Sequence, residues 1–340
     1  MNDLAHLKDW FQLPDATKLN IFTEAGRRVG LPAMAVEKDW WVVHALSLIF
    51  SMDCAPSLIF KGGTSLSKGW NLIQRFSEDI DLALDKEFLG FTIEEPNKKA
   101  VNQLRRLSYE YIANTFTPEL RTRFSKAGFQ NVIVKHQDVK NHDQDSLVVE
   151  IYYPKLTETD TYLKPGLLVE VGSRSLIEPN TQRTFATFVA ENFTGQPFAD
   201  KPVTVPVLNP ERTFLEKIFL LHEEFQRSDE KKRVERLSRH LYDIEKLIDT
   251  GFADNALQNK DLYKSIVKHR SIFVKLADVD YTRHSPEHIK FLPPFELLPL
   301  WEADYRQMQE NMIYGDSMPF ADLLKRLTEL QARINGIRWN

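Results

Sequence analysis

Cysteine is nearly absent from the sequence, which holds only Cys54 in 340 residues. One cysteine can form neither an intramolecular disulfide nor a thiolate cluster around a metal ion, and this scarcity is typical of a reducing cytoplasm. Long apolar runs are also missing. The longest, residues 42–50, is interrupted by His44 and Ser47 and is far shorter than the roughly 20 residues that span a bilayer. The N-terminus has no basic segment followed by an apolar one, so we expect no signal peptide, no membrane contact and a cytoplasmic protein.

The chain also has no excess of positive charge, because 44 Lys and Arg against 48 Asp and Glu give a net charge of −4. The overall field therefore does not attract nucleic acid, and any polyanion must meet a local basic patch. The most basic segment is 231–240, although Glu235 and the acidic residues beside it dilute its charge. A solvated helix face is the simplest interpretation of this segment, and contact with an RNA backbone is the alternative.

The length and the hydrophobic content of 42% suit two packed lobes. The periodicity predicts an α/β half, residues 1–208, and a helical half, residues 209–340. Apolar or alternating segments predict strands at 57–60, 79–84, 131–134, 147–153, 167–171, 184–189 and 203–208. Helical spacing is found at 1–31, from Pro32 onward, and at 65–73, 96–117, 210–226 and 229–250, then in shorter segments past 260 and at 320–334. Prolines between 286 and 299 predict an irregular packed segment.

A pair of glycines follows the first predicted strand. The sequence there reads Lys61, Gly62, Gly63, Thr64, Ser65. Glycines between a strand and a helix let the backbone turn sharply and approach a ligand closely, and the first N–H groups of the helix attract an anion. The hydroxyl groups of Thr64 and Ser65 are additional donors. We therefore expect this turn to bind the triphosphate of a nucleotide.

Asp79 and Asp81 alternate with apolar residues in the next predicted strand. Residues two apart on a strand point to the same face, so the two carboxylates should lie side by side. Carboxylates this close stay ionised when a cation lies between them. Oxygen ligands suit Mg²⁺, with Mn²⁺ as a substitute, and an NTP supplies phosphate oxygens to complete the shell. The order strand, glycine pair, helix and acidic strand thus indicates metal-dependent nucleotidyl transfer.

These motifs resemble those of the AbiEii/AbiGii toxin family, a branch of the DNA polymerase β-like nucleotidyltransferases. The similarity lies in residues 61–68 and 75–82, with further matches at 36–41 and 239–243. It covers most of the chain from about residue 30 to residue 250. The resemblance implies an α+β fold: a polymerase β-like domain with a mixed sheet, residues 1–208, followed by a helical C-terminal domain, residues 209–340.

The family has a third acidic position on a later strand, and Glu170 matches it best. A third carboxylate can bind the metal and act as base for the attacking hydroxyl. Glu150 is the rival, because it lies in a similar alternating segment, and an exposed strand glutamate is the simpler interpretation of either residue. We favour Glu170.

Two further site residues are implied by the resemblance. Lys217, on a predicted helix, matches the lysine that meets the triphosphate, although a lysine on an amphipathic helix is usually exposed to solvent. Asp243 matches a final aspartate that orients Lys217 or a nucleotide group. Its alternative is a local ion pair with Arg239 or His240, four and three residues earlier.

The resemblance implies the toxin of a toxin–antitoxin or abortive-infection pair, with an antitoxin protein as partner. It also implies an NTP as substrate and an RNA as acceptor. The favoured acceptor is the 3′ end of tRNA, to which some members of the family add nucleotides. Two other classes remain open: transfer of a nucleotide or phosphate to a protein side chain, and a catalytically silent NTP-binding regulator.

Overall fold

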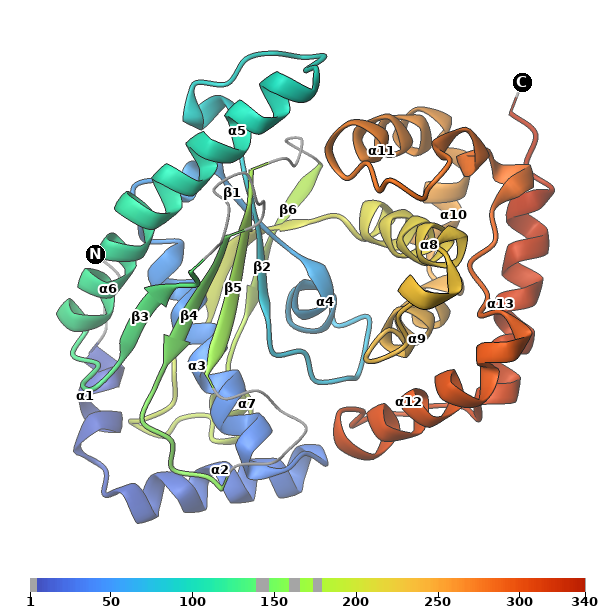
Figure 1. The fold of residues 1–340 in the computed structure, drawn as a ribbon. Helices are drawn as coiled ribbons and strands as arrows, with labels where there is room; N and C mark the ends of the chain where they lie inside the picture. Colours follow the sequence, from blue (N-terminus) through green and yellow to red (C-terminus); the bar gives the residue numbers. More distant parts are fainter. Residues whose placement is uncertain (1–4, 139–146, 159–165, 174–178, 340) are drawn as a thin grey trace. The chain divides into compact units, whose positions relative to one another are not determined.

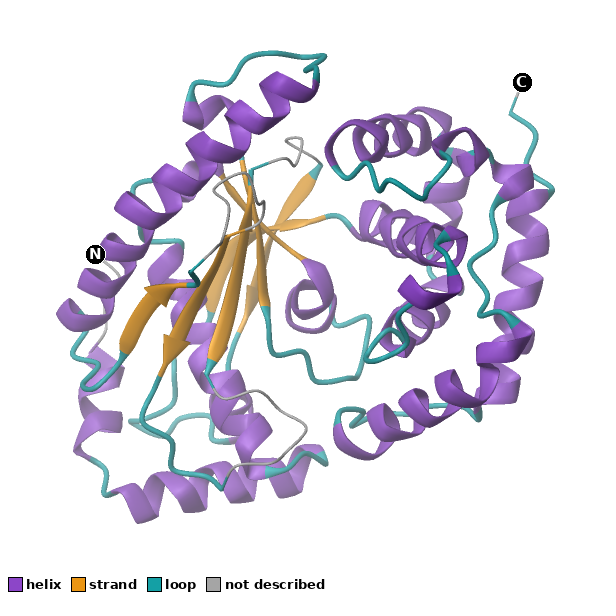
Figure 2. Ribbon diagram, in the orientation of Figure 1, coloured by secondary structure: helices purple, strands orange, loops and turns teal. Residues whose placement is uncertain are grey.

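The computed structural model describes residues 5–138, 147–158, 166–173 and 179–339. The chain forms two compact units. The first contains Met1–Asn71 and Phe76–Leu208, and the second contains Leu72–Arg75 and Asn209–Asn340. Over the described residues the first unit is built on a seven-stranded mixed sheet and the second consists mainly of helices, which confirms the predicted α+β class (Figures 1 and 2).

The sheet has the strand order β3-β4-β5-β2-β1-β7-β6. Its strands are β1 (Leu58–Lys61), β2 (Ile80–Leu84), β3 (Ile133–His136), β4 (Leu147–Tyr152), β5 (Leu167–Gly172), β6 (Asn180–Phe185) and β7 (Val203–Leu208). Strand β2 lies near the middle, antiparallel to β1 and parallel to β5. The predicted acidic strand is therefore flanked by the strand that precedes the glycine pair and by the strand that carries Glu170.

Strands β4 and β5 bury every second residue. In β5, Val169 and Val171 are buried, whereas Leu168 and Glu170 are partly exposed. Because successive side chains on a strand point to opposite faces, one face of the sheet belongs to the core and the other is more open. Glu170 lies on the open face.

Helices of the first unit lie along this sheet (Figure 1). They are α1 (Ala5–Gln12), α2 (Asp15–Val29), α3 (Ala33–Ile49), α4 (Gly62–Thr64), α5 (Lys98–Tyr111), α6 (Thr117–Lys126) and α7 (Phe188–Asn192), with π-helical turns at Ser65–Gly69 and Ile112–Phe116. Helix α3 packs against β5 and β7, and most of its residues are buried. The buried Trp40 and Trp41 are part of this packing.

The second unit contains α8 (Pro210–Gln226), α9 (Ser238–Ile248), α10 (Gly251–Gln258), α11 (Lys260–Phe273), α12 (Leu298–Asn311) and α13 (Phe320–Asn335). Short 3₁₀ turns of the two units cover Ala55–Ser57, Glu87–Leu89, Asp229–Lys231, Tyr281–His284, Pro286–His288 and Phe295–Leu297. Helix α12 is one of the shorter helices expected past residue 260, and it begins with Pro299 in its first turn, inside the segment that the prolines predicted to be irregular. None of the helices in the described part of the chain combines the length and apolar character needed to cross a membrane.

The predicted strand at 184–189 is wrong, because β6 ends at Phe185 and α7 begins at Phe188. The Thr187 side chain accepts a hydrogen bond from the Ala190 N–H at 2.9 Å, which caps the new helix. Asp39 accepts a second one from the Phe188 N–H at 2.8 Å. These partners satisfy the first N–H groups of a helix and favour it over the strand that alternation predicts.

The predicted helix at 229–250 is wrong in its first half, since α9 begins only at Ser238. Arg236 has a φ of 60°, and the carboxylate of Asp304 accepts hydrogen bonds from the Arg236 and Ser238 N–H groups. The basic residues before α9 also have acidic partners: Lys231 pairs with Asp278 at 2.6 Å and Arg233 with Glu224 at 2.7 Å. The segment is therefore not a continuous basic helix face. The helix expected at 65–73 is also shorter, ending at Gly69.

Candidate active site

Lys61, Asp81 and Glu170 form one row across three adjacent strands. Asp81 is paired with Lys61 on β1 and with Glu170 on β5. Residues paired directly across neighbouring strands point to the same face, so a cation and two carboxylates project together. All three are partly exposed, on the open face of the sheet.

Gly62 lies directly against the Asp81 side chain. A Cβ at position 62 would lie 1.9 Å from Oδ2 of Asp81, and the φ of Gly62 is +78°. Both the left-handed backbone and the close approach require glycine. The predicted sharp turn is therefore confirmed. The backbone of this turn, which continues through Gly63 in α4, touches the Asp81 carboxylate at the centre of the row.

The hydroxyl groups of Thr64 and Ser65 are used inside this turn. Thr64 Oγ1 donates to the backbone oxygen of Asp79 at 2.5 Å, and Ser65 Oγ donates to that of Gly62 at 2.9 Å. Both residues are buried. Their hydroxyl protons thus hold the turn and the start of the acidic segment together, instead of projecting toward a ligand. The first backbone N–H groups of the turn remain the donors best suited to a phosphate.

Asp79 immediately precedes β2 and is held from the side of α3. Its neighbour Glu78 is buried and forms an ion pair with buried Lys38 at 2.5 Å. Burial lowers the pKa of Lys38, and the negative charges of Glu78 and Asp79 oppose that shift. Lys38 therefore lies close enough to Asp79 to feel its charge.

The next residue of α3 anchors the other side of the glycine turn. Asp39 pairs with Lys68, in the π-helical turn Ser65–Gly69, at 2.8 Å. The Lys68 ammonium also lies 4.0 Å from the centroid of the Phe188 ring. Helix α3 thus fixes both segments that carry the site. The sequence did not predict this role of Lys38 and Asp39, because their partners lie on segments distant in the chain.

Glu150 lies one strand further from Asp81 than Glu170 does. On β4 it pairs with Lys135 at 3.4 Å and accepts hydrogen bonds from Gln137 and Tyr152 at 2.9 and 3.0 Å. Lys135 lies on β3 and Gln137 directly follows it, so both approach the carboxylate from the edge of β4 that faces away from β2. Glu170 is therefore the better placed of the two candidate acids.

The described part of the chain contains no group of three or more His, Cys, Asp or Glu side chains gathered closely enough to hold a metal ion. Asp81 and Glu170 nevertheless form a pair in register on neighbouring strands. Mg²⁺ at nucleotide sites is commonly held by one or two carboxylates together with phosphate oxygens of the substrate. The donor set of the row therefore fits Mg²⁺ in its chemistry, with the nucleotide as the source of further ligands.

In the second unit, Asp243 is fully buried between two cations. Arg75 donates from Nε and Nη2 to its two carboxylate oxygens at 2.7 and 2.8 Å, and Lys217 Nζ lies 2.8 Å from Oδ2. Burial alone would raise the pKa of Asp243, but the charges of Arg75 and Lys217 hold it below its usual range. Asp243 is therefore ionised, and it fixes the position of Lys217.

These contacts bear on the simpler interpretation of each residue, solvent exposure for Lys217 and a local ion pair for Asp243. Lys217 is only 7% exposed, so the interpretation as a solvent-exposed lysine is wrong. The cationic partners of Asp243 are not only local ones, because its ion pairs reach Arg75 and Lys217 on other segments. His240 instead lies 3.5 Å from Lys217 Nζ, and burial, with the charges of Lys217 and Arg239, lowers its pKa. A neutral His240 can accept a hydrogen bond from Lys217.

The mixed sheet carries a glycine turn against an acidic strand, the helical unit carries a buried Lys–Asp pair, and the family profile that matches the chain gives the class as nucleotidyltransferase. A sequence profile described as nucleotidyl transferase AbiEii toxin, Type IV TA system, matches residues 49–326. The chain therefore belongs to the AbiEii family, as the motifs predicted. The family implies a nucleotidyltransferase toxin of a toxin–antitoxin system, with a nucleotide substrate and an antitoxin partner. No curated protein sequence matches the chain.

Proposed function

We propose that this protein is a Mg²⁺-dependent enzyme that transfers NMP from an NTP to the 3′-hydroxyl of an RNA, with tRNA as the favoured acceptor. The observation that carries the proposal is the row formed by Lys61, Asp81 and Glu170, with Gly62 in contact with Asp81. The family supports nucleotidyl transfer, and the row supplies the carboxylates that such chemistry uses.

Each residue of the row has a distinct task in the proposed reaction. Asp81 and Glu170 would hold Mg²⁺, which when bound neutralises phosphate charge and favours ionisation of the attacking hydroxyl. The acceptor oxygen forms a bond to the α-phosphorus, the bond from that phosphorus to the bridging oxygen breaks, and pyrophosphate leaves. Glu170 takes the proton of the hydroxyl. Lys61 contributes positive charge beside the phosphates, and the Gly62–Gly63 backbone allows close approach.

Asp79 and Lys217 complete the set of proposed site residues. Thr64 donates a hydrogen bond to the backbone oxygen of Asp79 and Lys38 pairs with the adjacent Glu78, and these contacts hold the segment from which the Asp79 carboxylate would serve as a further metal ligand. In the second unit Asp243 fixes Lys217, and a lysine kept in one orientation serves as a point charge for a triphosphate. The ordered surroundings of both residues support their assignment to the reaction.

The test is to incubate the purified protein with total bacterial tRNA, Mg²⁺ and each α-labelled NTP in turn. Label in tRNA with the wild type, and none with Asp81→Asn, supports the proposal and names the nucleotide. Glu150→Gln is the matched control, because it changes a carboxylate on the same face one strand further from Asp81. Label on protein would replace RNA by a protein acceptor. Absence of label from both would contradict nucleotidyl transfer to either class.

A further inference from the structure

The second unit contains a pocket of about 610 Å³ that belongs to none of the motifs described above. Its walls come from α11, from the turns between Tyr281 and Glu287, and from residues 337–339. This volume lies within the range of small-ligand sites, about 300–1,000 Å³. Its lining brings together basic and aromatic side chains, in a protein whose net charge is −4.

Four cations and one carboxylate line the pocket. The cations are Lys260, Lys264, Lys268 and Arg338, and the carboxylate is Glu287. The three lysines are four residues apart on α11, so they form one stripe along the helix. At 1.5 Å per residue the stripe extends over about 12 Å, the length of three to four stacked nucleotides. The positive charge is thus arranged along a line, as a polyanion requires.

Aromatic rings stand beside this stripe. Trp339 packs edge-on against Tyr263, with ring centroids 4.9 Å apart, and Tyr281 also lines the pocket. Trp339 and Tyr281 are partly exposed, whereas Tyr263 is buried. Partly exposed rings next to cations offer surfaces on which bases can stack.

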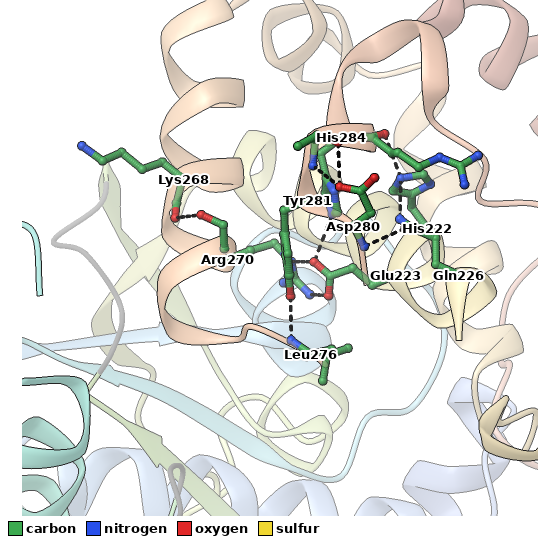
Figure 3. A network of polar contacts seen from close by, with 12 residues as sticks. His222, Glu223, Gln226, Lys268, Arg270, Leu276, Asp280, Tyr281 and His284 are labelled. Carbon is green, nitrogen blue, oxygen red and sulfur yellow. Dashed lines mark hydrogen bonds and ion pairs between the residues drawn. The ribbon is translucent and has the colours of Figure 1, made fainter. Parts of the chain in front are cut away.

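Tyr281 and His284, which line the pocket, belong to a network of polar contacts (Figure 3). The Tyr281 ring stacks on the ring of His284 at 4.8 Å, and Tyr263 donates a hydrogen bond to the His284 backbone oxygen at 2.7 Å. His284 Nε2 lies 3.2 Å from Glu223, which Arg270 holds by two contacts of 2.6 Å. The rings are therefore fixed before any ligand arrives, which reduces the entropy lost on binding.

We propose that this pocket binds a single-stranded segment of the acceptor RNA, with phosphates along the lysine stripe and a base against Trp339 or Tyr281. A basic groove flanked by stacking rings is the usual architecture of single-strand recognition. A linear stripe of lysines beside aromatic rings favours RNA over an acidic peptide, which would use the cations but not the rings. The inference rests on the proposed function, because it assigns a binding site to the RNA acceptor.

The test measures binding without catalysis, by fluorescence anisotropy of a labelled 12-nucleotide single-stranded RNA in the absence of NTP. Lys264→Glu should weaken binding at least about fivefold, and Lys264→Gln should reduce the slope of log K against log salt by about 0.7. Trp339→Ala should weaken binding without changing that slope, because stacking releases no counterion. Lys325→Glu, an equal charge change at an exposed lysine of α13 that does not line the pocket, should leave the affinity unchanged.

Equal affinities of Lys264→Glu and Lys325→Glu would overturn the proposal. So would unchanged affinity of Trp339→Ala combined with displacement of the RNA by a poly-glutamate peptide, since the pocket would then bind anions without recognising bases. Thermal melting of each variant checks that it is folded. Asp81→Asn should bind the RNA as the wild type does. Normal RNA binding with no transfer by the wild type would therefore contradict the proposed function and leave this site standing.

Discussion

Gly62 and Asp81 are so close that no side chain can stand between them: an added Cβ would lie 1.9 Å from the Asp81 carboxylate. Gly62→Ala should therefore displace Asp81 and reduce nucleotidyl transfer by at least about 10²-fold, besides straining the backbone by about 1–3 kcal/mol. Gly90→Ala is the matched control, because Gly90 has a similar φ of +74° but nothing within 4 Å of the added Cβ. Equal transfer activity of the two variants would show that the added Cβ at position 62 has no effect on the reaction beyond backbone strain.

Glu170 and Glu150 can be separated by one substitution each. Glu170→Gln should lower the rate of transfer about 10²-fold or more, because it removes a proton acceptor and a metal ligand beside Asp81. Glu150→Gln should keep most of the activity, since its contacts are with Lys135, Gln137 and Tyr152. Initial rates at saturating NTP decide the matter, and the reverse order of effects would make Glu150 the third acid.

Substitution of Lys217 should mainly reduce transfer activity, whereas substitution of Asp243 should mainly reduce stability. Lys217→Met leaves Asp243 paired with Arg75, so the protein should fold while transfer falls strongly. Asp243→Asn leaves two buried cations without their carboxylate and should cost about 3–5 kcal/mol of stability. Urea unfolding and transfer assays of both variants test this. Unchanged kinetics of Lys217→Met would restrict Lys217 to a structural role.

The buried pair of Lys38 and Glu78 should show strong coupling in a double-mutant cycle. Lys38→Met leaves an unpaired buried carboxylate, and we expect a loss of about 3–5 kcal/mol in the free energy of unfolding. Adding Glu78→Gln should recover part of that loss. A coupling energy near zero, measured by urea unfolding, would mean that the pair does not hold the segment of Asp79.

His222 should make the second unit less stable in mild acid. Burial, followed by the charge of His284, lowers the pKa of His222 from 6.5 to about 4. As the pH falls, the unfolded chain takes up the proton first, so stability decreases between about pH 6.5 and pH 4, by up to about 3 kcal/mol. The midpoint of thermal unfolding should follow this trend, and His222→Gln should flatten it. A wild-type midpoint that is constant over this range would contradict the assignment.

Local sequence signals predicted much of the fold. Helix α8 begins and ends where the periodicity and Pro210 place it, at Pro210–Gln226, and the glycine turn has the expected geometry. The predicted helix and strand boundaries were wrong where hydrogen bonds from side chains of distant segments outweighed the local sequence preference. Asp39 and Thr187 convert a predicted strand into α7, and Asp304 delays the start of α9.

The site was predictable in the parts that are encoded locally. Spacing alone places Asp81 and the glycines, but the register of β2 with β5 depends on strand pairing across the sheet. The Arg75–Asp243 pair spans 168 residues, and no periodicity reports a contact of that range. Likewise, the sequence of α3 does not reveal that Lys38 and Asp39 point toward Glu78 and Lys68.

Segment Leu72–Arg75 belongs to the second unit although the chain on both sides of it belongs to the first. A protein truncated after Leu208 would keep Arg75 but lose its partner Asp243. A fragment starting at Asn209 would keep Asp243 and Lys217 but lose Arg75. The units therefore cannot be separated by a single cut. Proteolysis or split-gene expression at one position would yield two incomplete pieces, because the second unit is made of two separate stretches of the chain.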